Sequence, residues 1–198
     1  MSLAPNEWAA FTIAVCFAAG LNVYATVATL GLLARAGVVT LPGSLEVVSN
    51  WWIIGTCGVM FLLEFVADKI PVFDLVWNVL QTAVRIPVSA VLAFAAAQPL
   101  GLGGQVLAAA AGGTIAFAAH SGKLAARTAA TASPEPASNF FLSLAEDVFA
   151  IGITWFATQH PYLAAAIVLT LVAAIVLSIR WVIRAIRRRK QLATKASP

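Results

Sequence analysis

Four ionisable residues lie inside long apolar runs of this sequence, where they could exchange protons or bind an ion. Glu64, Arg85 and the adjacent pair Glu146 and Asp147 are flanked by hydrophobic residues. An ionised side chain in hydrocarbon costs at least about 2.5 kcal/mol, so each of these groups needs a partner or water. Two adjacent carboxylates do not both ionise easily in a dry site unless a base is close. The pattern indicates a polar cavity in which one carboxylate, Glu64 or Glu146, exchanges protons or binds a cation.

Other polar residues repeat around these four at the spacing of an α-helix. At about 100° per residue, Asp74, Asn78 and Arg85 share one face of a helix, and Glu64 shares a face with Asp68. The candidate site therefore combines polar residues from several expected helices. Its members are Asn22, Tyr24, Glu64, Asp68, Asp74, Asn78, Arg85, His120, Lys123, Arg127, Asn139, Glu146 and Asp147.

A purely structural role is an equally supported interpretation of these charges. The buried acids and bases nearly balance, which allows mutual salt bridges that hold the helices together. His120, near a helix end, is more simply a satisfied interfacial histidine than a proton relay. Asn22 and Tyr24 more often form hydrogen bonds between helices than bind a substrate.

The sequence contains no recognisable motif for a metal ion or a cofactor. Cys16 and Cys57 both lie in apolar runs, and His120 and His160 are far apart along the chain. Neither a Cys/His ligand set nor a His-Glu-x-x-His pattern can be assembled from them. We therefore expect no metal ion and no cofactor, and we interpret the two cysteines as small core residues.

The composition indicates that the candidate site belongs to a membrane protein. The chain has 198 residues, of which 61% are hydrophobic and only 10% are charged. Soluble domains usually carry about 25% charged residues, so a soluble globule is excluded. A span needs roughly 20 apolar residues, and six such segments fit this chain. They cover approximately residues 8–34, 48–67, 72–97, 105–132, 138–159 and 161–187.

The expected fold is an all-α, polytopic membrane helix bundle with six transmembrane helices. Residues 1–190 would form a single transmembrane domain, and residues 191–198 would form the end of a basic cytoplasmic tail. An internal repeat over 8–98 and 99–188 would be a 3+3 inverted repeat, a common plan in transporters. Only a few residues match between the two proposed repeats, and chance explains these matches equally well. The matched positions are Gly31 and Gly122, Asn50 and Asn139, and Pro71 and Pro161.

The distribution of positive charge predicts the orientation of the bundle. Cytoplasmic loops retain Lys and Arg during insertion. Of the 12 Lys and Arg residues, all but Arg35 and Arg85 fall on one side of a six-span arrangement. We therefore expect a multi-pass protein of the cell (inner) membrane with both termini in the cytoplasm. The basic tail is expected to contact anionic membrane lipids and not nucleic acid. The sequence is also compatible with a homo-oligomer.

Helix geometry also predicts how the buried charges pair. Glu64 lies about one turn from the break before the next helix, whereas Arg85 lies some 16 Å along that helix beyond Asp74. Because the two side chains would then lie at different depths, we expect other partners for both. The expected pairs are Arg85 with Glu146 or Asp147, and Glu64 with Lys123 or Arg127.

Several motifs of the candidate site occur together in a fixed order along the chain. They comprise residues 20–26, residues 61–71, Asp74, Trp77, Thr82, Arg85, Pro87, His120, Lys123, residues 133–139, Glu146 and Asp147. This set resembles the bacterial integral membrane proteins grouped as domain of unknown function 4126, over roughly residues 20–160. The family name implies no activity, so the resemblance supports the choice of residues and adds nothing on mechanism.

The leading hypothesis is a small membrane transporter or channel for an ion or a small polar solute, with a charged cavity open to the cytoplasm. One alternative is an intramembrane enzyme acting on a lipid head group, with carboxylates as general acid and base and arginines on the phosphate. The other alternative is a non-catalytic membrane scaffold, in which the charges form only ion pairs. Since no catalytic motif is found, the enzyme ranks below the transporter and no catalytic residue is assigned.

Overall fold

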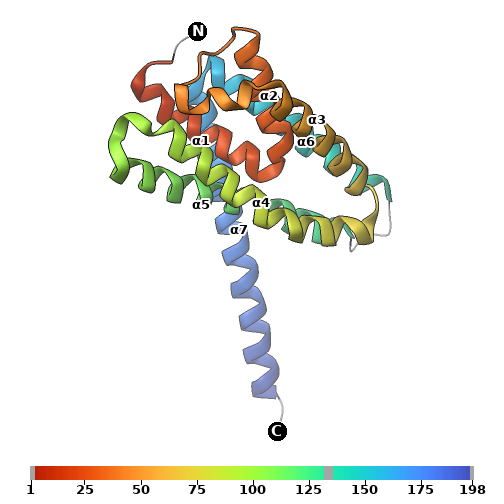
Figure 1. Ribbon diagram of the computed structural model, residues 1–198. Coiled ribbons are helices and arrows are strands. Elements are labelled where there is room, and N and C mark those ends of the chain that lie inside the picture. The colour runs from red at the N-terminus through yellow and green to blue at the C-terminus, as the bar shows by residue number, and fades with distance from the viewer. Residues whose placement is uncertain (1–2, 132–135, 197–198) are drawn as a thin grey trace.

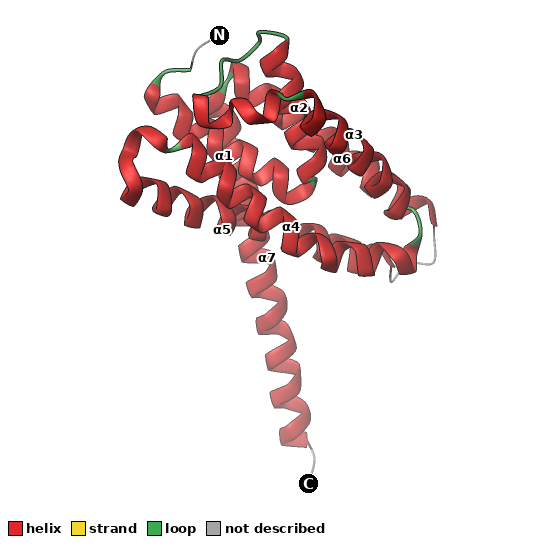
Figure 2. Ribbon diagram, in the orientation of Figure 1, coloured by secondary structure: helices red, strands yellow, loops and turns green. Residues whose placement is uncertain are grey.

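The computed structural model describes residues 3–131 and 136–196 as a bundle of helices (Figure 1). These residues form α-helices and short 3-10 helices joined by brief loops, with no strand among them (Figure 2). The prediction of an all-α fold is therefore confirmed for this part of the chain. The elements are α1 (Pro5–Leu21), α2 (Val23–Arg35), η1 (Gly43–Ser49), α3 (Trp51–Ala67), α4 (Pro71–Ala96), η2 (Gln98–Leu100), α5 (Gly101–Thr131), α6 (Pro136–Gln159) and α7 (Pro161–Ala196).

Four helices of the described residues are long and apolar enough to cross a membrane. A fifth span is obtained when η1 and α3, which are bent by 58° relative to each other, are counted together. Helices α1 and α2 are apolar but shorter. The structure thus fits a membrane protein with four or five spans, and a sixth is not confirmed. The four segments are Val76–Ala96, Gln98–Ala129, Phe140–Gln159 and Pro161–Arg188.

The apolar run expected to form one helix over residues 8–34 is divided at Asn22. The backbone of Asn22 is extended, with φ −149° and ψ 102°, so the helical path stops there. Its side-chain oxygen accepts a hydrogen bond from the Ala25 N–H at 2.9 Å, which caps the first turn of α2. The Asn22 N–H still donates to Ala18 O and closes the last turn of α1. The prediction of a continuous first helix was wrong because Asn22 satisfies the backbone groups at both helix ends.

Helix α1 is packed closely against α5, and the two run in the same direction. A Cβ atom added to Gly20 would lie 2.5 Å from the carbonyl oxygen of Ala116, so the two backbones touch there. One turn earlier, a Cβ atom on Gly112 would lie 2.9 Å from Cys16 Sγ. The contacts advance together along both helices, which makes α1 and α5 parallel.

Helix α2 runs from Asn22 back toward the start of α3. At its end, Arg35 Nη1 donates to Ser49 O at 3.0 Å, and the guanidinium lies 4.4 Å from the centre of the Trp51 ring. In the adjoining segment, Ser44 Oγ donates to Ala95 O, near the end of α4, at 2.8 Å. The end of α2 therefore lies at the end of the bundle where α3 begins and α4 finishes.

The beginning of α1 lies at this same end of the bundle. Leu3 and Trp8 line one cavity together with residues 40–42, which follow α2, and with Leu100, which joins α4 to α5. Helices α1 and α2 therefore form a helical hairpin, hereafter the α1–α2 hairpin, whose tip is Asn22. Both of its outer ends lie at what we call the N-terminal end of the bundle (Figure 1).

The opposite end of the bundle, hereafter the charged end, holds the connection between α3 and α4 beside the first turns of α6. There Ser143 Oγ donates to Asp68 Oδ2 at 3.3 Å, and Lys69 Nζ lies 5.2 Å from the centre of the Phe140 ring. Helix α7 packs past α5, since a Cβ atom on Gly122 would lie 2.7 Å from Ile175 Cδ1. Beyond that contact α7 projects away from the other helices (Figure 1).

Candidate functional site

Seven ionisable residues from four elements lie together in the interior near the charged end. None of them is more than 8% exposed, although several carry full charges. We call this group the charge cluster, and its members belong to α3 and its C-cap, α4, α5 and α6. They are Glu64, Asp68, Arg85, Lys123, Arg127, Glu146 and Asp147.

Lys123 and Arg127, one turn apart on α5, connect the acids of α3 and α6. Lys123 Nζ lies 3.5 Å from Glu64 Oε1, 3.4 Å from Asp68 Oδ2 and 3.3 Å from Glu146 Oε2. Arg127 Nη2 lies 2.6 Å from Asp68 Oδ2 and 2.7 Å from Glu146 Oε2. The predicted pairing of Glu64 with Lys123 is confirmed, and a pair of Arg127 with Glu64 is not found among these contacts.

Arg85 pairs with Glu64, so the prediction that it would pair with Glu146 or Asp147 was wrong. Arg85 Nη2 donates to Glu64 Oε1 in an ion pair with no exposure on either side chain. Side chains lean toward the N-terminus of their own helix. In the antiparallel pair α3 and α4, the two side chains therefore lean toward each other and close the difference in depth. The Arg85 side chain extends far along its own helix, since its Nη1 lies 3.5 Å from Asn78 Oδ1, seven residues earlier.

His120 joins the charge cluster as a neutral side chain that is buried and hydrogen-bonded. Arg85 Nη1 lies 2.9 Å from His120 Nδ1, and a guanidinium can only donate, so Nδ1 is an acceptor. His120 Nε2 lies 2.7 Å from Thr82 Oγ1, which itself donates to Asn78 O at 3.1 Å. The proton of His120 therefore lies on Nε2. His120 is satisfied, as the simpler interpretation held, but it lies in the interior, only 1% exposed.

The tip of the α1–α2 hairpin contacts the charge cluster directly. Asn22 Nδ2 donates to Asp147 Oδ1 at 2.9 Å, and Lys123 Nζ donates to Leu21 O, at the end of α1, at 3.2 Å. Tyr24, in the first turn of α2, accepts from Gln81 Nε2 at 3.2 Å. The two residues predicted to form hydrogen bonds between helices therefore do so, and Asn22 does so at a break in the helical path.

Two of the predicted site residues, Asp74 and Asn139, have side chains that lie outside the described residues. The structure adds three residues that the candidate site omitted, namely Gln81 and Thr82 on α4 and Ser143 on α6. The helical spacing that selected Asn78 and Arg85 also includes Gln81 and Thr82, so the signal for them was present in the sequence.

Lys69 is a further amine at the edge of the charge cluster, just after α3. Its Nζ donates to Phe65 O at 3.0 Å and lies over the Phe65 ring. Desolvation lowers the pKa of Lys69, and the carboxylates of Asp147 and Asp68 oppose this shift. Within the described residues, no group of three His, Cys, Asp or Glu side chains is arranged to hold a metal ion.

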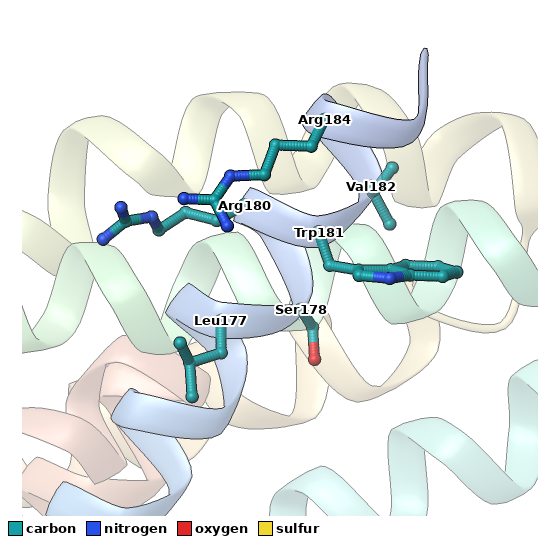
Figure 3. Close-up of a pocket in the computed structure, with 6 residues that line it drawn as sticks. All are labelled: Leu177, Ser178, Arg180, Trp181, Val182 and Arg184. Carbon is teal, nitrogen blue, oxygen red and sulfur yellow. The ribbon is translucent and has the colours of Figure 1, made fainter. Parts of the chain in front are cut away.

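Two cavities among the described residues lie away from the charge cluster. One of about 730 Å³ is formed by the projecting part of α7, where the guanidinium groups of Arg180 and Arg184 extend on one side and the Trp181 ring on the other (Figure 3). Another of about 580 Å³ lies at the N-terminal end and is lined mainly by apolar residues of α1, α4 and α5. The charge cluster itself is closed, since even Glu146 is only 8% exposed.

The double role of Asn22 leads to a prediction about stability. Asn22→Ala should lower the free energy of unfolding by about 1 kcal/mol for the lost helix cap and by a further 1–3 kcal/mol for the hydrogen bond lost to the buried Asp147. Asn50 provides a matched control, because its side chain caps α3 by accepting from the Trp52 N–H at 2.9 Å in an exposed position. Denaturant unfolding of both variants in detergent micelles measures the difference. Equal losses for Asn22→Ala and Asn50→Ala would show that the contact with Asp147 contributes nothing.

The fold and the buried charges define an all-helical protein with helices suited to a membrane. A family model described as Domain of unknown function (DUF4126) matches residues 9–181, and the chain belongs to this family. No curated protein and no solved structure matches the chain significantly.

Proposed function

We propose that the protein is a small membrane transporter that moves a small ion or polar solute past the charge cluster. The observation that carries the proposal is the position of the hairpin tip, where Asn22 contacts Asp147 and the last carbonyl of α1 contacts Lys123. Broken helices in transporters place their free backbone ends at the substrate site near the middle of the membrane. Non-helical backbone at membrane depth is tolerated only inside protein or beside a water-filled cavity, and the tip of this hairpin is buried in protein.

The free-energy cost of burying the charge cluster supports the same proposal. Three basic and four acidic groups are withdrawn from solvent, and each buried ion carries a desolvation penalty of several kcal/mol that pairing only partly offsets. Replacing such a network by apolar residues is often neutral or stabilising, so stability alone is a weak reason to keep it. Ionisable residues inside membrane helices commonly mark ion and proton pathways. In this proposal the described conformation is a closed state of the transporter.

We further propose a topology of five crossings and one hairpin that enters and leaves at the same face. Helices α3 to α6 each run between the two ends of the bundle, whereas the α1–α2 hairpin does not cross. Helix α7 begins where α6 ends and then projects away from the other helices, and we count it as the fifth crossing (Figure 1). This topology differs from the expected six crossings. It also does not allow the 3+3 inverted repeat, because that repeat requires residues 8–34 to cross the membrane once. Lys69, Lys123 and Arg127, near the charged end, favour a cytoplasmic side for that end, while Arg35 lies at the N-terminal end. As the end of the fifth crossing, the basic part of α7 would then lie on the same side of the membrane.

The topology predicts that the two chain termini lie on opposite sides of the membrane, in contrast to the expectation from charge counting over six spans. In a background without Cys16 and Cys57, a cysteine at the exposed position of Asn6 should react with a membrane-impermeant thiol reagent in intact cells. A cysteine at the exposed position of Arg188 should react only after permeabilisation. Protection of both positions in intact cells would instead support two cytoplasmic termini.

Flux through reconstituted liposomes tests the proposed function. We expect at least one monovalent ion or small polar solute to cross liposomes that contain the protein faster than protein-free liposomes. Folded protein that moves none of the solutes offered would favour the scaffold. Turnover of a lipid head group in the same vesicles, followed by mass spectrometry, would favour the enzyme.

A further inference from the structure

The cavity of about 580 Å³ at the N-terminal end, hereafter the apolar cavity, has the size and lining of a site for an apolar ligand. Ala93 and Ala96 on α4 and Ala108 on α5 are short side chains that leave space between the helices. A cavity of only about 150 Å³ with an apolar lining binds benzene, so this one has room for a longer hydrocarbon. The larger side chains around it are Leu3, Trp8, Ile13, Leu41, Leu100 and Ile115.

The polar side chains of the apolar cavity do not favour water or an ion inside it. Thr12 Oγ1 donates to Trp8 O at 2.7 Å, and Cys16 Sγ donates to Ser89 O at 3.4 Å, so both groups are already hydrogen-bonded. Thr40 is exposed, and no charged residue of the described part of the chain lines the cavity. A buried water needs two to four polar partners, which this lining does not offer. The lining therefore favours a hydrocarbon chain.

A second cavity, of about 520 Å³, adjoins the apolar cavity and has a charged lining. The two cavities share Thr40 and Leu41, and we call the second one the polar cavity. Arg35 and Glu46 both line it and are both exposed. Arg35 Nη1 donates to Ser49 O, which leaves the guanidinium with further N–H donors for an anion. The polar cavity thus offers one cationic and one anionic side chain next to a space for hydrocarbon.

The tryptophans of the N-terminal end indicate its depth in a membrane. Trp51 is 60% and Trp52 is 84% exposed beside the polar cavity, and tryptophan is enriched at the level of the lipid head groups. The apolar cavity follows α1 inward from Trp8 to Cys16, a rise of about 12 Å over eight residues. The polar cavity therefore lies at head-group level, and the apolar cavity extends from there toward the middle of the membrane.

We propose that the two cavities form one binding site for a phospholipid with a zwitterionic head group, such as phosphatidylethanolamine. One acyl chain fills the apolar cavity, the phosphate contacts Arg35, and the ammonium group contacts Glu46. Arginine binds phosphate through paired N–H donors, and an anionic lipid would leave Glu46 beside a second negative charge. The site lies at the opposite end of the bundle from the charge cluster, so the proposal does not depend on the proposed transport.

Thermal unfolding of the purified full-length protein in detergent tests the proposal, because a ligand that binds only the folded state raises Tm. Phosphatidylethanolamine is compared with phosphatidylglycerol and with diacylglycerol, all carrying the same acyl chains. Phosphatidylethanolamine should raise the Tm by at least about 4 °C, and the other two lipids by less than half of that. Equal stabilisation by all three lipids, or by none, would overturn the proposal.

Filling the apolar cavity tests where the acyl chain binds. Ala108→Phe places a ring in the cavity and should abolish the rise in Tm that the lipid causes. Ala110→Phe is the matched control, because Ala110 is exposed on the same helix outside the cavity lining, and it should keep the full rise. If Ala108→Phe does not fold, Ala111→Phe replaces it, since Ala111 also lines the cavity but is exposed. A full rise in the cavity-filling variant would contradict the proposal.

Two further variants test the contacts with the head group. Arg35→Gln and Glu46→Gln should each lose the preference for phosphatidylethanolamine over diacylglycerol, whereas Arg180→Gln, on the exposed part of α7, should keep it. Retention of this preference in both head-group variants would overturn the proposal. Light scattering supplies the last comparison. If the wild type is a dimer in detergent and Ala108→Phe is a monomer, a second copy of the chain and not a lipid fills the cavity, which also overturns the proposal.

Discussion

Replacing Arg85 with alanine is expected to lower the free energy of unfolding by about 3–5 kcal/mol, the cost of removing one partner from a buried ion pair. Arg85 is 0% exposed, pairs with Glu64 and donates to both His120 and Asn78. Without it, Glu64 keeps only the longer contact of 3.5 Å to Lys123, and His120 Nδ1 loses its donor. The loss should be measurable by reversible unfolding in mixed micelles.

Two further variants make this prediction specific. Arg180→Ala removes an exposed arginine of α7 and should change stability by less than about 0.5 kcal/mol. Combining Arg85→Ala with Glu64→Gln should recover part of the loss, because removing both charges of a buried pair costs less than removing one. A double variant no more stable than Arg85→Ala would show that the pair with Glu64 is not the main contribution of Arg85.

The second large effect is expected at Gly20, where α1 touches α5. The Cβ of Gly20→Ala would lie 2.5 Å from Ala116 O, 2.8 Å from Ala116 Cα and 2.8 Å from Ala119 Cβ. Two of these atoms belong to the backbone of α5, so the helices themselves must move apart. Overpacking of this kind typically costs about 1–3 kcal/mol, and we expect a loss in that range.

Gly55→Ala is the matched control for this prediction. A Cβ atom at Gly55 meets nothing within 4 Å, and alanine is favoured over glycine inside a helix by up to about 1 kcal/mol. Gly55→Ala should therefore leave stability unchanged or raise it, whereas Gly20→Ala lowers it. Equal effects of the two substitutions in the same unfolding assay would show that the close approach of α1 and α5 is not needed.

The later helices could be predicted closely from the sequence, and the first one could not. Pro71 and Pro161 stand at the first position of α4 and α7, where proline is tolerated, so the starts of both helices were evident. The run over residues 8–34 has no proline and no charge before Arg35, so composition alone favours one span. The signal for its break is Asn22 alone, which caps α2 with its side-chain oxygen and donates from its side-chain nitrogen to Asp147, far along the chain.

The residues of the charge cluster could be predicted from the sequence, but not all of the ion pairs between them. Helical spacing placed Glu64, Lys123 and Glu146 on inward faces, and the three side chains do meet. The partner of Arg85 is determined by how far its long side chain extends along the helix axis. The spacing of residues along the sequence does not contain this information. Depth counted between Cα positions therefore selected the wrong acid for Arg85.

The central claim is that the contact between the hairpin tip and the charge cluster serves transport, and the flux of two matched variants tests it most directly. Asn22→Ala and Asn50→Ala both remove a helix cap, but only Asn22 also contacts Asp147. The two folded variants are reconstituted in equal amounts, with the solute that the wild type moves. Asn50→Ala should retain the wild-type rate, and Asn22→Ala should lose at least about tenfold, which corresponds to the loss of one buried hydrogen bond to a charged group. Equal rates for both variants would contradict the claim and leave the hairpin tip with a structural role only.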